Sequence, residues 1–222
     1  MDTKLTGKTR IESDLIGARE IPAEALYGVQ TLRGIENFSI SKFRLSEYPL
    51  FIKGLAITKM AAAMANFELG LLTVEQKDAI IAACGEIIDG KHHDQFPVDM
   101  IQGGAGTTTN MNANEVIANR ALELMGHERG EYQYCSPNDH VNCSQSTNDA
   151  YPTAIHIGMY FKHLQLLPHL EELIASFRKK GEEFSQIIKM GRTQLEDAVP
   201  MTLGQTFNGF ASILQDEIAH LN

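Results

Sequence analysis

The chain has 222 residues, of which 43% are hydrophobic and 21% charged, and its formal net charge at pH 7 is −9. This length and composition are typical of a soluble globular protein with a substantial buried core. Because an acidic surface repels nucleic-acid phosphates and anionic lipids, the charge disfavours nucleic acid and membranes as partners. An anionic small molecule is not excluded, since helix N-termini can bind a carboxylate within an acidic protein.

The chain contains three cysteines, Cys84, Cys135 and Cys143. Their odd number and their spacing fit neither a disulfide framework nor a zinc site, so we expect free thiols in a reducing, cytoplasmic compartment. No cluster of side chains requires a metal or another cofactor, and we expect none. The polar N-terminus lacks the apolar core of a signal peptide, and no stretch is expected to span a membrane.

Glycine and proline divide residues 1–48 into short pieces, in which we expect short extended segments. Helical patterns then predict three helices, at about 49–70, 74–90 and 110–126, each ending at a glycine. Thr73 and Gln76 have the spacing of a capping box at the start of the second of these helices.

A long helix is expected from about 148 to 185, with a kink near Pro168. A loop containing the sequence GRTQLEDAVP follows, and a last helix begins near Thr202. Apolar residues recur in this helix at steps of three and four, at Phe207, Phe210, Leu214, Ile218 and Leu221. The apolar period still runs at the last residue without a stop signal. We therefore interpret the chain as truncated, with a last helix that needs a partner.

Three loops have compositions that suit a binding site. The first runs from Gly103 to Asn110 with the sequence GGAGTTTN and precedes a helix. Its glycines allow close backbone approach, the helix offers free N–H groups, and the threonines add hydroxyl donors, a combination that suits a carboxylate or phosphate. A glycine-rich turn with a threonine or asparagine cap is the alternative, and the loop is not a P-loop.

The second loop, residues 137–149, uses short neutral donors and acceptors in place of lysine and glutamate. Ser146, Thr147 and Asn148 lie at the start of the long helix, where they can cap it and also form an anion site. His140 is a candidate acid or base, with a structural hydrogen-bonding role as the alternative. In the third loop, residues 191–200, Glu196 and Asp197 are a possible carboxylate pair, but a structural role beside Arg192 is favoured.

These loops carry a resemblance to a known family. The spans GGAGTTTNMNANEVIANRA, PNDHVNCSQSTNDAYPT and GRTQLEDAVPMTLGQ, with IPAEALYGVQTLRGIENF nearer the N-terminus, resemble conserved regions of the aspartase/fumarase superfamily. Their order and spacing match that superfamily over essentially the whole chain. Class II fumarases typically have histidine after GRT and serine in QSSND, where this chain has Gln194 and Thr147. These two residues favour the aspartase branch, with class II fumarase as the alternative.

The resemblance implies a mainly α fold with short strands near the N-terminus. It also implies two domains: an N-terminal lyase domain over residues 1–148, and over residues 149–222 the beginning of a truncated central helical bundle. In the family this bundle forms the core of a homotetramer, and each active site is assembled from three subunits.

The resemblance further implies a reversible elimination that converts L-aspartate to fumarate and ammonia. By match to the family, the substrate-binding residues are Thr107, Ser146, Thr147, Asn148 and Thr193. Additional candidates are Gln194, Arg33 and His140, and Arg33 could equally form a structural ion pair.

The family's general base is a serine on a Gly-Ser-Ser/Met-Pro-Lys loop towards the C-terminus, which also supplies a lysine and an asparagine. Residues 1–222 contain no match to that loop. We therefore expect this chain to hold substrate-binding groups but no catalytic base, and to show no turnover alone. A non-catalytic helical scaffold or binding module is the alternative from another class of function.

Overall fold

The structure, a computed structural model, describes residues 7–221. It is mainly helical and has two separate two-stranded sheets, which confirms the expected mainly α fold with short strands. The chain divides into two compact units, Met1–Met159 and Tyr160–Asn222. The domain boundary expected at residue 148 stays a prediction.

The first unit begins with a hairpin in which β1 (Thr9–Asp14) and β2 (Gly17–Pro22) pair antiparallel. These strands are the extended segments expected near the N-terminus. Helix α1 (Val29–Asn37) follows and was not predicted. It begins after Gly28, which has no side chain to cap it, so no local sequence signal marks this helix.

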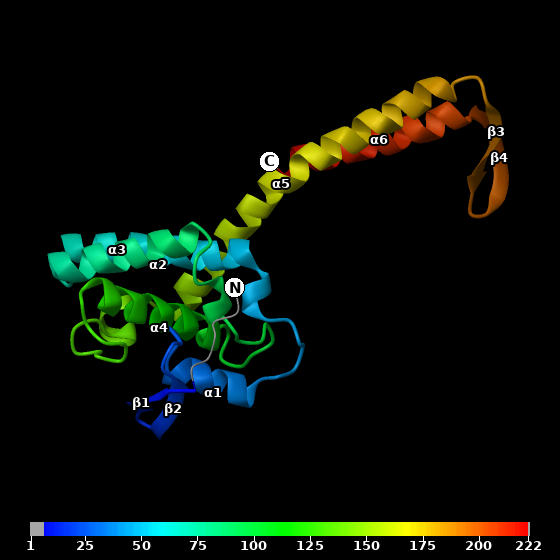
Figure 1. The fold of residues 1–222 in the computed structure, drawn as a ribbon. Coiled ribbons are helices and arrows are strands. Elements are labelled where there is room, and N and C mark those ends of the chain that lie inside the picture. The colour runs from blue at the N-terminus through cyan, green and yellow to red at the C-terminus, as the bar shows by residue number, and fades with distance from the viewer. Residues whose placement is uncertain (1–6, 222) are drawn as a thin grey trace. The chain divides into compact units, whose positions relative to one another are not determined.

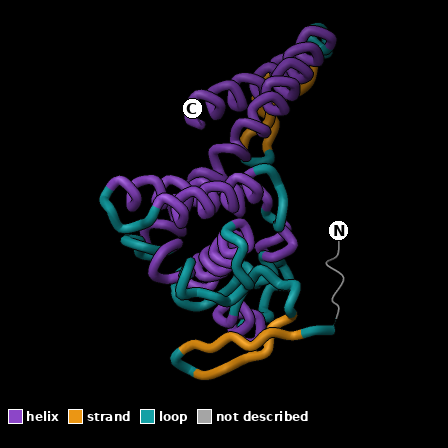
Figure 2. The backbone as a smooth tube through the Cα atoms, turned by 60° about the vertical axis from the view of Figure 1, so that its left-hand side comes forward, coloured by secondary structure: helices purple, strands orange, loops and turns teal. Residues whose placement is uncertain are grey.

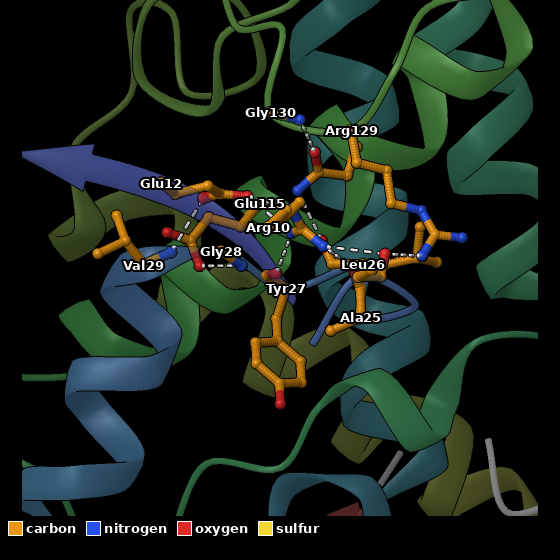
Figure 3. A network of polar contacts seen from close by, with 12 residues as sticks. Arg10, Glu12, Ala25, Leu26, Tyr27, Gly28, Val29, Glu115, Arg129 and Gly130 are labelled. Atoms are coloured by element: carbon orange, nitrogen blue, oxygen red, sulfur yellow. Dashed lines mark hydrogen bonds and ion pairs between the residues drawn. The ribbon is translucent and has the colours of Figure 1, made fainter. Parts of the chain in front are cut away.

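Two distant carboxylates bind the N–H groups that open α1 (Figure 3). Glu115 accepts hydrogen bonds from the backbone N–H groups of Gly28 (2.8 Å), Gln30 (2.8 Å) and Thr31 (3.0 Å). Glu12 accepts from the N–H of Val29 at 3.1 Å. Burial raises the pKa of Glu115, and the hydrogen bonds from this segment limit the rise. The start of α1 is therefore fixed by side chains far away in sequence.

The arginine of β1 completes this network (Figure 3). Arg10 donates to the Glu12 carboxylate at 2.7 and 2.9 Å, and also to the carbonyl oxygens of Ala25 (2.7 Å) and Tyr27 (2.8 Å). Tyr132 donates its hydroxyl to Glu12 at 2.9 Å. The Glu12 carboxylate is nearly buried, and its hydrogen bonds with Arg10 and Tyr132 offset the cost of removing it from water.

Three helices form the core of the first unit: α2 (Pro49–Glu68), α3 (Val74–Ile88) and α4 (Thr107–Leu124). They pack side by side in both views (Figures 1 and 2). The predicted capping box is confirmed, because Thr73 accepts from the Gln76 N–H and Gln76 accepts from the Thr73 N–H.

The interior between these helices is filled by fully buried aliphatic side chains, among them Ile52, Leu55, Ile80, Ile117 and Leu122. Such packing supplies the main stabilisation of a helical unit.

Helix α2 corrects one expectation. With 20 residues and a mean hydropathy of 1.3, it is long and apolar enough by composition to cross a membrane, and among residues 7–221 it is the one helix that passes this test. Its side chains Ile52, Leu55 and Ala63 are buried in the core formed with α3 and α4. Burial in this core therefore accounts for the apolar side chains on one face of α2, and 39% of its apolar window is buried in the chain.

Three short helical turns connect these elements: η1 (Leu45–Glu47), η2 (His93–Gln95) and the π-helical turn η3 (Pro137–Val141). Asp99 orders the loop before η1, since it accepts from the N–H groups of Ile40 (2.9 Å) and Ser41 (2.8 Å) and from the Ser41 hydroxyl (2.6 Å). These hydrogen bonds hold the pKa of Asp99 well below its usual range.

Helix α5 (Thr147–Glu183) runs without interruption through Pro168, near which a kink was expected. In the second unit its C-terminal part packs along α6 (Leu203–Leu221), where Ile174 is buried together with Ala211. The start of α6 near Thr202 is confirmed, because the Thr202 hydroxyl accepts from the Gln205 N–H at 3.1 Å.

The segment between α5 and α6 is a hairpin, where a loop was predicted. Strands β3 (Ile188–Thr193) and β4 (Glu196–Thr202) pair antiparallel around a two-residue turn. The turn residues Gln194 and Leu195 have φ values of 51° and 67°, as in the turns that join tight hairpins. The prediction was wrong because the turn lacks the usual glycine and the strands, exposed along most of their length, lack an apolar alternation.

Candidate functional site

The loop before α4 has an unusual backbone. Gly104, Ala105 and Gly106 have consecutive positive φ values of 74°, 50° and 92°. Helix α4 begins at Thr107, three residues earlier than predicted, so the threonines form its first turn. Thr107 is exposed and donates its hydroxyl to the Gly104 carbonyl at 2.5 Å. The glycines allow the sharp turn that leaves this helix N-terminus open to a ligand.

Thr107 and Thr109, both in that first turn, are not equivalent. Thr109 is buried, and the Gln102 amide binds both its N–H (2.7 Å) and its hydroxyl (2.8 Å). Thr107 is at the surface, where its hydroxyl can exchange the Gly104 carbonyl for a ligand oxygen as its acceptor. Of the two, Thr107 is therefore the residue placed to meet a ligand.

Ser146 caps the start of α5, since its hydroxyl accepts from the Asn148 N–H at 3.2 Å. Ser146 and Asn148 are exposed, and Thr147 between them is half-buried. This segment therefore presents two hydroxyls and an amide around the positive end of a long helix dipole.

The N-termini of α4 and α5 adjoin within the first unit. The ring of Tyr151 lies against Gly106, where an added Cβ would come 2.5 Å from ring atoms. The Asn110 amide nitrogen is 3.3 Å from the Thr147 hydroxyl oxygen. The structure therefore brings the helix start at Thr107 close to the Ser146–Asn148 segment. Two positive helix ends with neutral donors form a site suited to a carboxylate.

Arg33 is engaged elsewhere in the first unit. Its guanidinium forms two hydrogen bonds of 2.8 Å to the Asp14 carboxylate and a third of 2.8 Å to the Gly17 carbonyl. Arg33 holds the pKa of Asp14 below its usual value. These contacts fasten the β1–β2 hairpin to α1, which favours the structural alternative for Arg33, and its role toward substrate stays a prediction.

His140 lies in η3 and takes part in internal hydrogen bonding. Its Nδ1 accepts from the Ser136 N–H at 2.8 Å, and its Nε2 lies 3.2 Å from the side-chain nitrogen of Gln76. Burial lowers the pKa of His140, and nearby Asp139 opposes this shift. The neutral, hydrogen-bonded ring fits the structural alternative for this residue.

The other expected residues belong to the second unit. Thr193 ends β3, Gln194 begins the exposed turn, and their roles toward substrate stay predictions. The Asp197 carboxylate lies 3.6 Å from the Arg192 Nε, and both side chains are largely exposed. This pair agrees with the structural role favoured for Asp197.

The sequence patterns missed a polar cluster behind the two helix starts, in which three members are buried and two are half-buried. Its members are Lys59, Asn110, Asn114, Asn142 and Gln145. The run of alternating asparagines from Asn110 to Asn114 is the signal that could have revealed it, because three amides within five residues of a buried helix require partners.

The cysteines are free thiols, and Cys84 and Cys135 are buried. Burial raises the pKa of both thiols to about 12, so they are unreactive at neutral pH. Within residues 7–221, no group of three or more His, Cys, Asp or Glu side chains is placed to hold a metal ion.

The first unit thus combines a mainly helical fold with two adjoining helix starts that offer neutral donors. The sequence profile of a family described as lyase matches residues 17–222. The chain therefore belongs to this lyase family, the aspartase/fumarase family that its loops resemble.

Two of the relatives that match the chain are aspartate ammonia-lyases. The chain is 59% identical to the aspartate ammonia-lyase of Pseudomonas canavaninivorans, over 96% of the chain and 45% of that protein. It is 55% identical to the aspartate ammonia-lyase of Escherichia coli K12, over 98% of the chain and 46% of that protein. The chain thus spans about half the length of the curated relatives it matches.

Solved structures agree with this comparison. A crystal structure of fumarate lyase:delta crystallin from Brucella melitensis, bound to cobalt, matches with a TM-score of 0.91 and 54% identity, over 96% of this chain and 46% of that one. A class II fumarase from Schistosoma mansoni matches with a TM-score of 0.84 and 39% identity, over 94% and 44%.

Proposed function

We propose that the complete protein carrying this chain is an aspartate ammonia-lyase, which interconverts L-aspartate with fumarate and ammonia. The observation that carries the proposal is the pair of adjoining helix N-termini at Thr107 and Ser146–Asn148, in a chain 55–59% identical to aspartate ammonia-lyases. Identity to a class II fumarase is lower, at 39%, which favours aspartate over malate as the substrate.

The chemistry explains why neutral donors suit this site. Removal of a proton from Cβ of aspartate places negative charge on the adjacent carboxylate, so the transition state needs donors aimed at those oxygens. In the proposal, Thr107, Ser146, Thr147 and Asn148 supply hydroxyl, amide and backbone donors at the positive ends of α4 and α5. Their interaction strengthens as charge develops, which lowers the barrier to proton removal.

Other groups complete the proposed enzyme. Thr193 and Gln194 of the β3–β4 turn bind substrate, and the general base is a serine outside residues 1–222. Each active site takes residues from three subunits of a homotetramer. A cytoplasmic location is supported by the free thiols of Cys84, Cys135 and Cys143.

One assay tests the proposal against its alternatives. Formation of fumarate is followed by its ultraviolet absorbance, with the complete protein and with the 222-residue chain, each supplied with aspartate or malate. We expect the complete protein to act on aspartate, and the 222-residue chain to act on neither substrate. Preference for malate would identify a fumarase, whereas inactivity of the complete protein on both would favour a non-catalytic scaffold.

A further inference from the structure

Lys59 is buried in the middle of the apolar helix α2. Its side chain is 0% exposed, and its Nζ donates to Asn142 Oδ1 and to Gln145 Oε1, both at 2.9 Å. Among the residues that the structure describes, no carboxylate forms an ion pair with this amine. Burying an amine without a counter-charge is costly, and burial lowers the pKa of Lys59 to about 7. Such a cost points to a role beyond filling the core.

Lys59 fixes the orientation of the Asn142 amide. Since the amine donates to Asn142, the side-chain oxygen of Asn142 must face it. The same oxygen also accepts from the amide nitrogens of Asn110 (3.0 Å) and Asn114 (3.2 Å). The Asn142 amide nitrogen points the other way and donates to the Gln145 carbonyl at 3.0 Å. The side-chain oxygen of Asn142, in the turn that leads into α5, is thus hydrogen-bonded to residues of both α2 and α4.

The orientation of Asn110 follows from that of Asn142. The oxygen atoms of the Asn110 and Asn114 amides are buried and have no hydrogen-bond partner among the described residues. Their NH₂ groups, in contrast, both face Asn142. The amides therefore take the orientation that Asn142 imposes, although it leaves two acceptors unsatisfied.

A further hydrogen bond connects Asn110 to Thr147 of the candidate site. The amide nitrogen of Asn110 carries two hydrogens, of which one goes to Asn142 and the other to Thr147 Oγ1 at 3.3 Å. Because Thr147 accepts this hydrogen bond, its own hydroxyl hydrogen is free to be donated to a ligand. The Lys59 amine orients the Asn142 amide as a donor, and the Asn142 oxygen orients the Asn110 amide as an acceptor, so the path begins at Lys59.

We propose that Lys59 is a positioning residue, which acts through Asn142 and Asn110 to hold the Thr147 hydroxyl as a donor toward the substrate carboxylate. This inference rests on the proposed function. It assigns no direct contact between Lys59 and substrate. It requires that removal of the Lys59 donors be felt at Thr147 and nowhere else in the site.

A double-mutant cycle in the complete protein tests the inference, with kcat/KM for aspartate as the readout. Thr147→Val removes one transition-state donor and is expected to lower kcat/KM about 100-fold. Lys59→Met preserves the apolar stem and is expected to lower it about 10-fold. If Lys59 acts through Thr147, the double variant falls within about twofold of Thr147→Val. A loss of kcat/KM in the double variant that equals the product of the two single losses would overturn the proposal.

Controls separate positioning from general destabilisation. Lys91→Met makes the same exchange at an exposed lysine and should leave kcat/KM within about twofold of wild type. Lys59→Arg restores N–H donors and should recover part of the loss. If Lys59→Met does not fold, Lys59→Gln leaves a polar group in the core and enters the same cycle.

Binding of succinate, an unreactive dicarboxylate, distinguishes failure of the inference from failure of the proposed function. Calorimetry on the same variants should show the same non-additive pattern for succinate affinity. Succinate binding with this pattern but no aspartate turnover would overturn the proposed function alone. Turnover with additive losses would overturn the role of Lys59 alone, and absence of both turnover and binding in the wild type would overturn both.

Discussion

Gly106 shows at the scale of one residue how the candidate site depends on close packing. Its φ of 92° lies in the region that favours glycine, and the ring of Tyr151 occupies the space that a Cβ would need. Gly126, at the other end of α4, has a similar φ of 83° but has no atom within 4 Å of its added Cβ. Both glycines therefore have a positive φ, but of the two only Gly106 has a side chain packed where a Cβ would lie.

This difference allows a matched prediction. Gly126→Ala should lower the free energy of unfolding by about 1 kcal/mol, from backbone strain alone. Gly106→Ala carries the same strain and also pushes away the Tyr151 ring that α5 packs against the start of α4. It should therefore destabilise the chain further and lower kcat/KM of the complete protein about 100-fold, because donor geometry is lost. Denaturant unfolding and steady-state kinetics check both variants, and equal effects would contradict this role for the Gly106 contact.

At the scale of elements, Glu86 joins α3 to α4. Its carboxylate binds the Arg120 guanidinium at 2.6 and 2.8 Å and lies 2.8 Å from the His92 ring. The hydrogen bonds from Arg120, with a smaller contribution from His92, lower the pKa of Glu86 to about 2. The unfolded chain, with an ordinary glutamate pKa, binds a proton more readily than the folded one between pH 4.5 and 2.

The stabilisation from Glu86 is therefore complete above pH 4.5 and is lost as the pH falls toward 2. Between pH 6 and pH 3, we expect wild type to lose about 2 kcal/mol of unfolding free energy more than Glu86→Gln. Urea unfolding of the chain at several pH values measures this difference. Glu75→Gln, at an exposed position of α3, serves as the control and should follow wild type. Parallel curves for Glu86→Gln and wild type would contradict the assignment.

Elements with a local signal could be predicted from the sequence, and those held by distant partners could not. Helices α2, α3 and α4 were found from apolar periodicity and closing glycines, and α3 also from the Thr73 capping box. Helix α1 was missed because its opening N–H groups are bound by Glu12 and Glu115, and Glu115 is more than 80 residues away in sequence. The β3–β4 hairpin was missed because its exposed strands lack an apolar face.

The same distinction applies to the site. Thr107 and Ser146–Asn148 were singled out because small neutral donors beside helix starts are a local pattern. Their proximity depends on the Tyr151–Gly106 contact, which spacing alone does not reveal. Lys59 gave no signal because a lysine in an apolar helix ordinarily extends to solvent, and its partner Asn142 is 83 residues away.

At the scale of the whole molecule, the chain is about half the length of the relatives it matches. In our account the chain contributes donors for the substrate carboxylate, and the catalytic base lies outside residues 1–222. We propose that the adjoining N-termini of α4 and α5 form the carboxylate site.

A crystal structure of the complete protein with bound succinate tests this claim most directly. We expect one succinate carboxylate within hydrogen-bonding distance of the Thr107 and Thr147 hydroxyls, beside the backbone N–H groups that open the two helices. Succinate bound elsewhere, with water between these helix starts, would contradict it.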